Sequence, residues 1–326
     1  MSLRVIHVGV GGRGEWPPQL MRGDPAWHSV ALVDSNPATL AVAAATASVG
    51  PDRCFGDLSQ ALAAVEADAV VVITPSALHG RFVQEALHAG KHVLVEKPFV
   101  HDLGEARRLV VRAERAGLCL VVAQNYRFGA PQRTLRRLLA EEAFGPAGYS
   151  SVIHHRYRPH PRAFTMPHAM LIEMSVHHFD DMRAVFGQAP TALTARSFNP
   201  PWSAYPGAAA VQALITFGQG LECLYEGTFT SHDDRFEWRI ECRDAALYWD
   251  GGAGLSAVAG GGQRLAVALD DVPGPPEACI LDAWLRYILH GEEPEISGRA
   301  NLATLALVDA AITSSREGRT VALEVG

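Results

Sequence analysis

The first 123 residues alternate between short apolar runs and longer mixed segments. The apolar runs predict strands at 4–8, 29–34, 69–74, 92–96 and 119–123. Because each run is apolar throughout, we expect these strands to be buried on both faces of a parallel sheet. The mixed segments predict helices, one of which begins where Asp102 stands three residues before Glu105. Strands and helices in this order predict an α/β domain over residues 1–123.

The pattern changes beyond residue 123, where strands come to dominate. Helices are predicted at 131–142 and 171–186, with a strand at 150–157 between them. Further strands are predicted at 211–217, 221–230, 236–242, 246–249, 255–258 and 264–269, and helices at 277–289 and 298–316. Short turns between successive strands are typical of antiparallel pairing. We therefore predict a second domain, 124–326, of the α+β class with a mainly antiparallel sheet.

A glycine motif follows the first predicted strand. It reads Gly9-Val-Gly11-Gly12-Arg13-Gly14 and matches G-x-G-x-x-G. In this motif Gly9 allows a tight turn, Gly11 lets a pyrophosphate approach the backbone, and Gly14 lets helix and strand pack closely. Helix N-terminal amides then face the phosphates. A glycine-rich turn without a ligand is the alternative, but the strand before the motif favours a Rossmann domain that binds a dinucleotide.

Asp34 ends the second predicted strand, about twenty residues after the motif. A carboxylate there accepts hydrogen bonds from the adenosine ribose hydroxyls. Ser35 and Asn36 follow, and no adjacent basic residue would neutralise a 2′-phosphate, so the sequence favours NAD over NADP. Alternatively, Asp34 caps the helix that begins at Pro37, and it can serve both roles.

Lys97 stands at the carboxyl end of a central predicted strand, in Val93-Leu-Val-Glu96-Lys97-Pro98. Open α/β sheets bind ligands at this edge. A lysine there can exchange a proton with a substrate hydroxyl or hold it by a hydrogen bond. A surface lysine that pairs with Glu96 is the alternative, and the position favours function. The Lys97–Pro98 bond is a candidate for the cis form.

The helix predicted at 171–186 carries a polar stripe on an otherwise apolar body. Glu173 and His177 are four residues apart and share one face, with Asp180 three residues further on. A carboxylate beside an imidazole raises its basicity and fixes its orientation, as a general base requires. A surface Glu–His pair is the alternative, and the earlier motifs favour the catalytic interpretation.

Composition and charge argue against nucleic acid and membranes as binding partners. The chain has 326 residues, with 28 basic against 35 acidic side chains, so it has no net positive field to attract nucleic acid or an anionic membrane. Its longest apolar stretch, 69–73, is far too short to span a bilayer, and the first strand begins without a preceding signal segment. We expect a cytoplasmic protein with reduced cysteines, since the five cysteines form no C-x-x-C pair.

A metal site is not favoured. Six histidines lie between residues 154 and 178, but they form neither H-x-x-x-H nor H-E-x-x-H. A metal-dependent hydrolase or isomerase therefore remains only an alternative, and we predict no metal.

Six motifs together resemble one known family over essentially the full chain. They are the glycine motif, Thr74-Pro75-Ser-Ala-Leu-His79, Ala89-Gly-Lys-His-Val93, Glu96-Lys97-Pro98, Gln124-Asn125-Tyr126-Arg127 and Glu317-Gly-Arg-Thr-Val321. The chain resembles the glucose-fructose oxidoreductase, inositol dehydrogenase and MocA family. The resemblance implies a Rossmann domain, an α+β domain whose open sheet makes subunit contacts in a homodimer or homotetramer, a nicotinamide cofactor, and a sugar, polyol or related substrate.

The resemblance also assigns residues. Lys97, Glu173 and His177 occupy the positions of the family's catalytic lysine, aspartate and histidine, and Asp180 closes the helix motif. The implied cofactor-binding set adds Thr74, Pro75, His79, Glu96, Lys97 and Asn125 to Asp34 and the glycine motif. Glu173 stands where Asp is typical, Ser175 where Gly is typical, and Ser76 where Asn is typical. The substrate therefore need not be inositol or glucose.

We predict reversible hydride transfer between a hydroxyl carbon and NAD, with His177 taking the hydroxyl proton while Lys97 hydrogen-bonds the same oxygen, or with these roles exchanged. The basic segment 154–162 suits hydroxyls or a carboxylate on a sugar, cyclitol or sugar acid. Predicted substrate residues are Tyr126, Arg127, Arg156, Arg158, His168 and Asp180. A lyase or glycosidase that uses tightly bound NAD for internal redox, and a catalytically silent NAD-binding regulator, are the alternatives.

Overall fold

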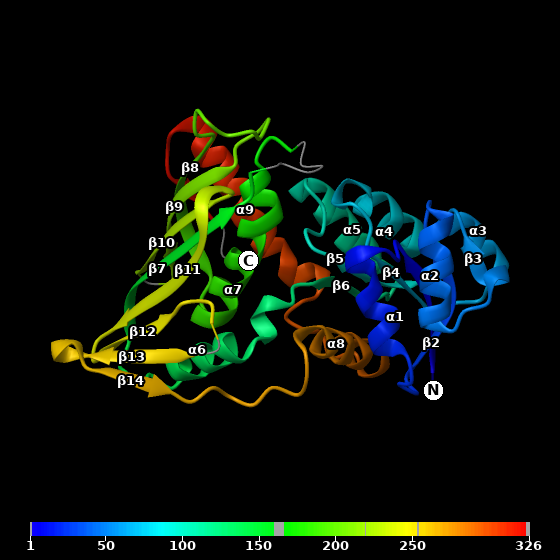
Figure 1. Ribbon diagram of the computed structural model, residues 1–326, viewed down its shortest axis with the longest axis horizontal. Helices are drawn as coiled ribbons and strands as arrows, with labels where there is room; N and C mark the ends of the chain where they lie inside the picture. Colours follow the sequence, from blue (N-terminus) through cyan, green and yellow to red (C-terminus); the bar gives the residue numbers. More distant parts are fainter. Residues whose placement is uncertain (1, 160–165, 219, 253, 324–326) are drawn as a thin grey trace. The chain divides into compact units, whose positions relative to one another are not determined.

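The computed structural model describes residues 2–159, 166–218, 220–252 and 254–323. Contacts between residues divide the chain into two units, each built around its own sheet (Figure 1). The first unit combines Met1–Asn125 with Pro273–Leu302, and the second combines Tyr126–Val272 with Ala303–Gly326. No helix in the described ranges is long and apolar enough to cross a membrane.

The first unit contains a parallel sheet of six strands within the described residues, in the order β3-β2-β1-β4-β5-β6. The strands are β1 (Leu3–Val8), β2 (Trp27–Val33), β3 (Cys54–Phe55), β4 (Ala69–Val72), β5 (His92–Glu96) and β6 (Leu120–Ala123). The five predicted strands are confirmed, and β4 is fully buried, as an apolar run predicts. Chain order reverses between β1 and β4, where such sheets bind ligands at the carboxyl ends of the strands.

Helices connect these strands and lie against the sheet (Figure 1). They are α1 (Trp16–Met21), α2 (Pro37–Ala47), α3 (Leu58–Ala64), α4 (His79–His88) and α5 (Leu103–Arg115), with short 3-10 turns at Gly12–Glu15, Pro51–Arg53 and Ser76–Leu78. The predicted cap of α5 is confirmed, because the amide of Glu105 donates to Asp102 Oδ1 at 2.6 Å.

A later segment of the chain also packs with the first unit. Helix α8 (Pro276–His290) places Trp284 against Trp27 of β2, with ring centroids 5.3 Å apart. The amide of Val122 in β6 donates to the carbonyl of Ile296 at 2.9 Å. The structure thus differs from a continuous second domain over 124–326, because the apolar face of α8 is buried on the first sheet rather than on the second.

The second unit contains a sheet of nine strands within the described residues, in the order β14-β13-β12-β11-β7-β10-β9-β8-β15. The strands are β7 (Ala147–Tyr157), β8 (Pro190–Phe198), β9 (Ala210–Phe217), β10 (Leu221–Thr228), β11 (Thr230–Cys242), β12 (Ala245–Trp249), β13 (Leu255–Ala259), β14 (Arg264–Val267) and β15 (Val321–Ala322). Neighbouring strands pair antiparallel except β7 and β10, which pair in parallel. The predicted mainly antiparallel sheet is confirmed, although β7 separates β10 from β11.

Helices cover one face of this sheet. They are α6 (Ala130–Ala140), α7 (Val176–Phe186) and α9 (Gly298–Glu317), with a 3-10 turn at Tyr126–Phe128 and a π-helical turn at Leu171–Ser175 before α7. Met182 of α7 contacts Cys223 of β10, with the two sulfur atoms 3.8 Å apart. Ser314 and Ser315 of α9 accept hydrogen bonds from backbone amides of β8. These contacts bury the inner face of the sheet and fix α7 upon it.

Candidate active site

The glycine motif forms a tight loop between β1 and α1. Gly9 has φ of +79°, and a Cβ atom there would overlap the carbonyl of Ile73. A Cβ at Gly14 would overlap the carbonyl oxygen of Gly9, and one at Gly11 would lie 2.8 Å from Thr39 Cγ2. Gly12 has φ of +55°, and a Cβ atom there would meet no other atom within 4 Å. The loop is therefore a close-packed cradle with one exposed backbone edge, which fits the pyrophosphate of a dinucleotide.

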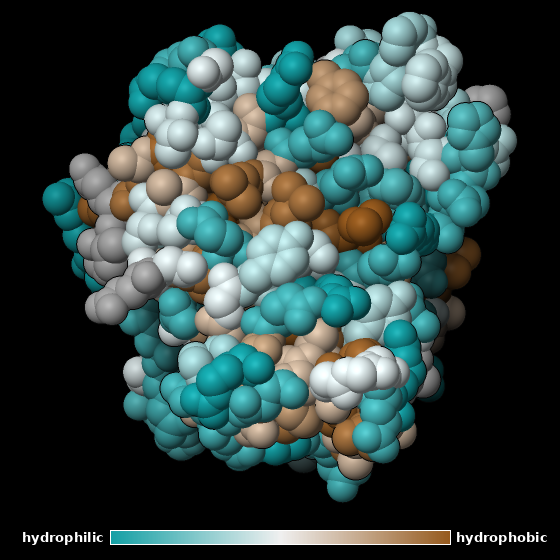
Figure 2. Space-filling model, turned by 90° about the vertical axis from the view of Figure 1, so that its left-hand side faces the viewer, coloured by the Kyte–Doolittle hydropathy of each residue, from teal (hydrophilic) through white to brown (hydrophobic). Residues whose placement is uncertain are grey.

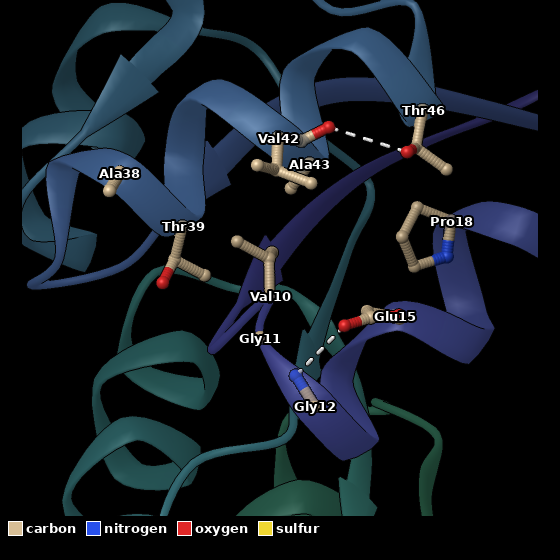
Figure 3. A pocket seen from close by; sticks show the side chains of 10 residues that line it. All are labelled: Val10, Gly11, Gly12, Glu15, Pro18, Ala38, Thr39, Val42, Ala43 and Thr46. Carbon is tan, nitrogen blue, oxygen red and sulfur yellow. Dashed lines mark hydrogen bonds between the residues drawn. The ribbon is translucent and has the colours of Figure 1, made fainter.

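A cavity of about 370 Å³ opens beside this loop, between α1 and α2 (Figure 3). It is lined by Val10, Gly11, Gly12, Glu15, Pro18, Ala38, Thr39, Val42, Ala43 and Thr46. The amide of Gly12 donates to Glu15 Oε1 at 3.2 Å (Figure 3). The Glu15 carboxylate thus accepts the hydrogen bond that the Gly12 amide could otherwise donate to a phosphate oxygen.

Asp34 fastens the glycine loop to the loop that follows β2. Its Oδ2 accepts from the amide of Val10 at 3.1 Å, and its Oδ1 accepts from the amide of Asn36 at 2.9 Å. The cap of α2 is Asn36, whose Oδ1 accepts from the amide of Ala38 at 2.9 Å. The alternative role of Asp34 as a helix cap is therefore wrong, and its carboxylate lies beside the glycine loop.

Lys97 follows the last residue of β5, and the Lys97–Pro98 peptide bond, a candidate for the cis form in the sequence, is cis. The side chain of Glu96 is buried, and its Oε1 accepts from the amide of Lys97 at 3.1 Å. Its other oxygen, Oε2, accepts from Arg13 Nε at 3.1 Å. Glu96 thereby links the glycine loop to the strand end that carries Lys97.

His79 connects two loops at the same edge of the sheet. It is 1% exposed, with Nδ1 2.8 Å from the carbonyl oxygen of Pro98 and Nε2 2.9 Å from that of Thr74. Burial lowers the pKa of His79, whereas its two carbonyl partners and Glu96 act in the opposite sense. His79 is thus an internal brace, and its contribution to the site acts through the loops of Thr74 and Lys97.

In the second unit the imidazole of His177 lies flat against the ring of Tyr126. The ring centroids are 4.1 Å apart and the planes differ by 7°. His177 is 5% exposed on the first turn of α7. A buried, stacked imidazole has one orientation, which is what proton transfer to a defined atom requires.

The turn before His177 is not the α-helix that the sequence predicted. Leu171–Ser175 is π-helical, and α7 begins at Val176. Ser175 Oγ donates to the carbonyl of Met170, five residues back, at 3.2 Å and accepts from Tyr225 Oη at 3.0 Å. π-turns are common at functional sites, and here the regular α-helical spacing between Glu173 and His177 is interrupted.

Arg127 and Asp180 meet each other inside the second unit. Arg127 Nε and Nη2 donate to the two oxygens of Asp180 at 2.8 and 3.1 Å, and Thr304 Oγ1 donates to Asp180 Oδ1 at 2.9 Å. Both members of the pair are buried. The pair clamps the turn that bears Tyr126 onto α7, and it thereby holds Tyr126 against His177.

Asp181, the next residue, was not predicted from sequence. It is 2% exposed, and its Oδ2 accepts from Gln132 Nε2 of α6 at 3.2 Å. Burial, together with the neighbouring charge of Asp180, raises the pKa of Asp181 well above its ordinary value. Burial therefore favours the protonated form of Asp181, and no local sequence signal distinguishes it from Asp180.

The predicted basic segment is only partly described. Arg158 lies over the ring of Phe229, 5.0 Å from its centroid, and Arg156 is half-buried in β7. His168 Nδ1 lies 2.9 Å from Ser197 Oγ, and burial lowers the pKa of His168. His160 and Arg162 lie outside the described residues.

His154, also in this segment, points to the inner face of the sheet. Its ring centroid lies 4.6 Å from that of His178, and burial lowers the pKa of His154 to about 4, with Arg156 adding to the shift. It is neutral at pH 7. Among the described residues, no group of three or more His, Cys, Asp or Glu side chains is arranged to hold a metal ion.

Glu277 was also missed, because it lies 264 positions from its partner. Its Oε1 accepts from Arg13 Nη2 at 3.0 Å and from Asn125 Nδ2 at 3.1 Å. Arg13 and Asn125 were both predicted to bind the cofactor. The local sequence around Glu277 does not predict this contact, because it arises from the packing of α8 within the first unit.

Comparisons with known proteins agree with this architecture. D-apiose dehydrogenase from Paraburkholderia graminis is 28% identical over 314 residues, which cover 90% of this chain and 83% of that protein. Inositol 2-dehydrogenase from Rhizobium meliloti is 25% identical over 345 residues, covering 99% of this chain and 100% of that protein. The crystal structure of aldose-aldose oxidoreductase from Caulobacter crescentus, complexed with glycerol, has a TM-score of 0.88 at 22% identity and covers 99% of this chain and 100% of that chain.

Family models match both parts of the chain. Residues 3–124 match the oxidoreductase family model with an NAD-binding Rossmann fold, and residues 132–248 match the GFO/IDH/MocA C-terminal domain. The two matches together span most of the chain and both sheets. The protein therefore belongs to the glucose-fructose oxidoreductase, inositol dehydrogenase and MocA family of NAD-binding oxidoreductases.

Proposed function

We propose that this protein oxidises a hydroxyl carbon of a sugar, cyclitol or sugar acid with NAD, and that the reaction is reversible. The observation that carries the proposal is the imidazole of His177, buried and stacked on Tyr126 within a chain that also has an NAD-binding glycine loop. The names of the relatives, D-apiose dehydrogenase and inositol 2-dehydrogenase, support a polyhydroxylated substrate.

The cofactor residues favour NAD over NADP. Gly9, Gly11, Gly12 and Gly14 form the cradle, and Asp34 beside it would accept hydrogen bonds from ribose hydroxyls. A 2′-phosphate would meet this carboxylate without a cation to offset it. When bound, NAD supplies the acceptor for the hydride.

Three side chains of this protein handle the substrate oxygen and its proton in the proposal. His177 takes the hydroxyl proton, Glu173 raises the basicity of the imidazole, and Lys97 hydrogen-bonds the same oxygen. Lysine is rare in this chain: Lys91 and Lys97 are the two lysines among 28 basic residues, and the rest are arginines. An arginine cannot give up its proton near neutral pH, so a lysine at 97 suits proton exchange.

Substrate recognition is assigned to the basic segment and its neighbours. Arg156, Arg158 and His168 would hydrogen-bond hydroxyls or pair with a carboxylate, and Tyr126 would cover a sugar face. Arg127 and Asp180 contribute by holding Tyr126 in place. Their charges satisfy each other, which supports a positioning role for both.

The test is NAD reduction by the purified protein with a panel of cyclitols, aldoses and sugar acids. We expect absorbance of the reduced cofactor with one class of substrate. Lys97→Arg and His177→Ala should each lower kcat by roughly 100- to 10,000-fold. Lys91→Arg, at the other lysine, is the matched control and should retain activity. NAD binding without reduction of NAD by any substrate would contradict the dehydrogenase and favour internal redox or a silent regulator.

We also propose that the protein is a homo-oligomer that pairs through the outer face of its second sheet. Apolar side chains gather on this side of the molecule (Figure 2). Leu214 of β9 and Leu224 of β10 are paired in register and are 47% and 44% exposed, and Tyr149 of β7 is 43% exposed. An apolar centre of this kind is typical of interfaces between like subunits.

Light scattering after size exclusion tests this assembly. Leu224→Glu should shift the protein toward the monomer, because a carboxylate would be buried at the centre of the interface. Asp309→Lys, at an exposed position of α9, is the control. An unchanged mass for Leu224→Glu would refute this interface.

We place the reaction in the cytoplasm, where NAD is available, and cell fractionation checks this location.

A further inference from the structure

A charged network inside the first unit ties the glycine loop to α8. Arg13, one residue before Gly14, donates through Nε to Glu96 at 3.1 Å and through Nη2 to Glu277 at 3.0 Å. Asn125 Nδ2 donates to the same Glu277 oxygen at 3.1 Å. The network therefore joins the loop after β1, the ends of β5 and β6, and the first turn of α8.

The charges in this network do not balance. One guanidinium faces two carboxylates, and both carboxylates are more buried than the guanidinium, with side-chain exposures of 8% for Glu96, 17% for Glu277 and 48% for Arg13. Glu277 is further stabilised as an anion by its place in the first turn of the 15-residue helix α8. The positive charge of Arg13 is therefore already engaged by protein carboxylates.

This arrangement matters because the ligand of the glycine loop is an anion. A pyrophosphate brings two negative charges to the backbone amides of the loop. Three carboxylates already bind groups of this loop: Glu15 accepts from the Gly12 amide, and Glu96 and Glu277 accept from Arg13. Within the described residues, Arg13 is the cation of the loop, and an unengaged arginine is the residue best suited to hold a phosphate.

We propose that Glu277 limits the affinity of the glycine loop for NAD by holding Arg13 away from the pyrophosphate. The consequence is weaker binding and faster release of NAD than the loop would allow without this contact. The inference rests on the proposed function for NAD as the ligand, and it deepens that function by naming a residue that tunes cofactor exchange.

Glu277→Gln is the informative variant. The amide keeps the size of the side chain and an oxygen that accepts from Asn125, so α8 keeps its contact, while Arg13 keeps Glu96 and loses the other of its two charged partners. We expect NAD to bind roughly three- to tenfold more tightly, mainly through slower dissociation, with a smaller difference at high salt. Calorimetric titration gives the affinity, and stopped-flow tryptophan fluorescence gives the dissociation rate, since Trp16 lies 5.9 Å from the Arg13 guanidinium.

Two controls separate the role of Arg13 from a general change of charge. Asp282→Asn removes a carboxylate of the same helix that pairs with Arg286 at 2.7 Å, and it should leave NAD affinity unchanged. In an Arg13→Gln background, Glu277→Gln should lose most of its effect, because the two residues act through one contact. Equal effects of Glu277→Gln with and without Arg13 would overturn the proposal.

Two ligands locate the effect on the pyrophosphate. ADP should show the same tightening with Glu277→Gln as NAD, whereas adenosine, which lacks phosphate, should not. Unchanged or weaker binding of NAD and ADP to Glu277→Gln, or equal tightening of adenosine, would refute the inference. These are binding measurements, so a failure to find an oxidised substrate would contradict the proposed function without affecting their outcome.

Discussion

The glycine loop and the His177 helix are built by different means. In the loop, a local backbone contact requires Gly14, since a side chain there would overlap the carbonyl of Gly9, and Gly9 and Gly11 are further required by Ile73 and Thr39 on adjacent elements. In the helix, the orientation of His177 depends on distant residues, through Tyr126 and the Arg127–Asp180 pair, which are 53 positions apart. Local sterics can be read from a motif, whereas a clamp between distant elements cannot.

The largest expected effect comes from breaking the clamp. Asp180→Asn leaves the Arg127 guanidinium buried without its charged partner, and we expect a loss of about 3–5 kcal/mol in the free energy of unfolding. The stacking of Tyr126 on His177 should loosen as well. Chemical denaturation followed by circular dichroism measures the loss of stability.

The exposed pair Arg243–Asp244 provides the control for the clamp. Asp244 lies 2.9 Å from Arg243 Nη2, but solvent screens both side chains, so Asp244→Asn should change stability far less. A similar loss for both variants would mean that the buried pair is no more important than a surface contact. The conclusion that the Arg127–Asp180 pair fixes the His177 helix, whereas local sterics fix the glycine loop, would then be wrong.

A smaller effect is expected from the glycine loop. Gly14→Ala forces a methyl group onto the carbonyl of Gly9, and overpacking of this kind costs about 1–3 kcal/mol. Because the overlap distorts the cradle, NAD affinity should fall as well. Gly56→Ala, where a Cβ meets no atom within 4 Å, is the matched control. Normal NAD binding by a folded Gly14→Ala protein would show that the loop can bind NAD without a glycine at position 14.

The same contrast explains how much the sequence could predict. The parallel sheet followed from continuous apolar runs, and the cap at Asp102 followed from adjacent residues. The insertion of β7 between β10 and β11 did not, because it depends on pairing between strands that are far apart in the chain rather than on the spacing of turns.

Missed residues in the site have the same origin. Glu277 reaches Arg13 only because α8 packs on the first sheet, and Ser175 at the end of the π-turn bonds to Tyr225 of β10, 50 positions away. Sequence patterns report the elements and the chemistry that each one carries. They do not report which carboxylate has a raised pKa or which arginine is engaged, because these properties depend on burial by distant residues.

The smallest expected effect concerns such a burial-dependent property, the protonation of Asp181. Its pKa is raised in the folded protein, chiefly by burial, so the folded state binds a proton that the unfolded chain releases above about pH 4. The stability of the wild type should therefore fall as pH rises from the pKa of the unfolded carboxyl toward that of the folded one.

Asp181→Asn removes this titration and keeps a neutral side chain beside Gln132. Its free energy of unfolding should gain on the wild type as pH increases through that window, and urea denaturation at a series of pH values measures the difference. Asp233→Asn, an exposed change on β11, should follow the wild type. A constant difference between Asp181→Asn and the wild type at every pH would mean that Asp181 is ionised in the folded protein. The helix that carries His177 would then hold two adjacent negative charges, Asp180 and Asp181, beside the guanidinium groups of Arg127 and Arg183.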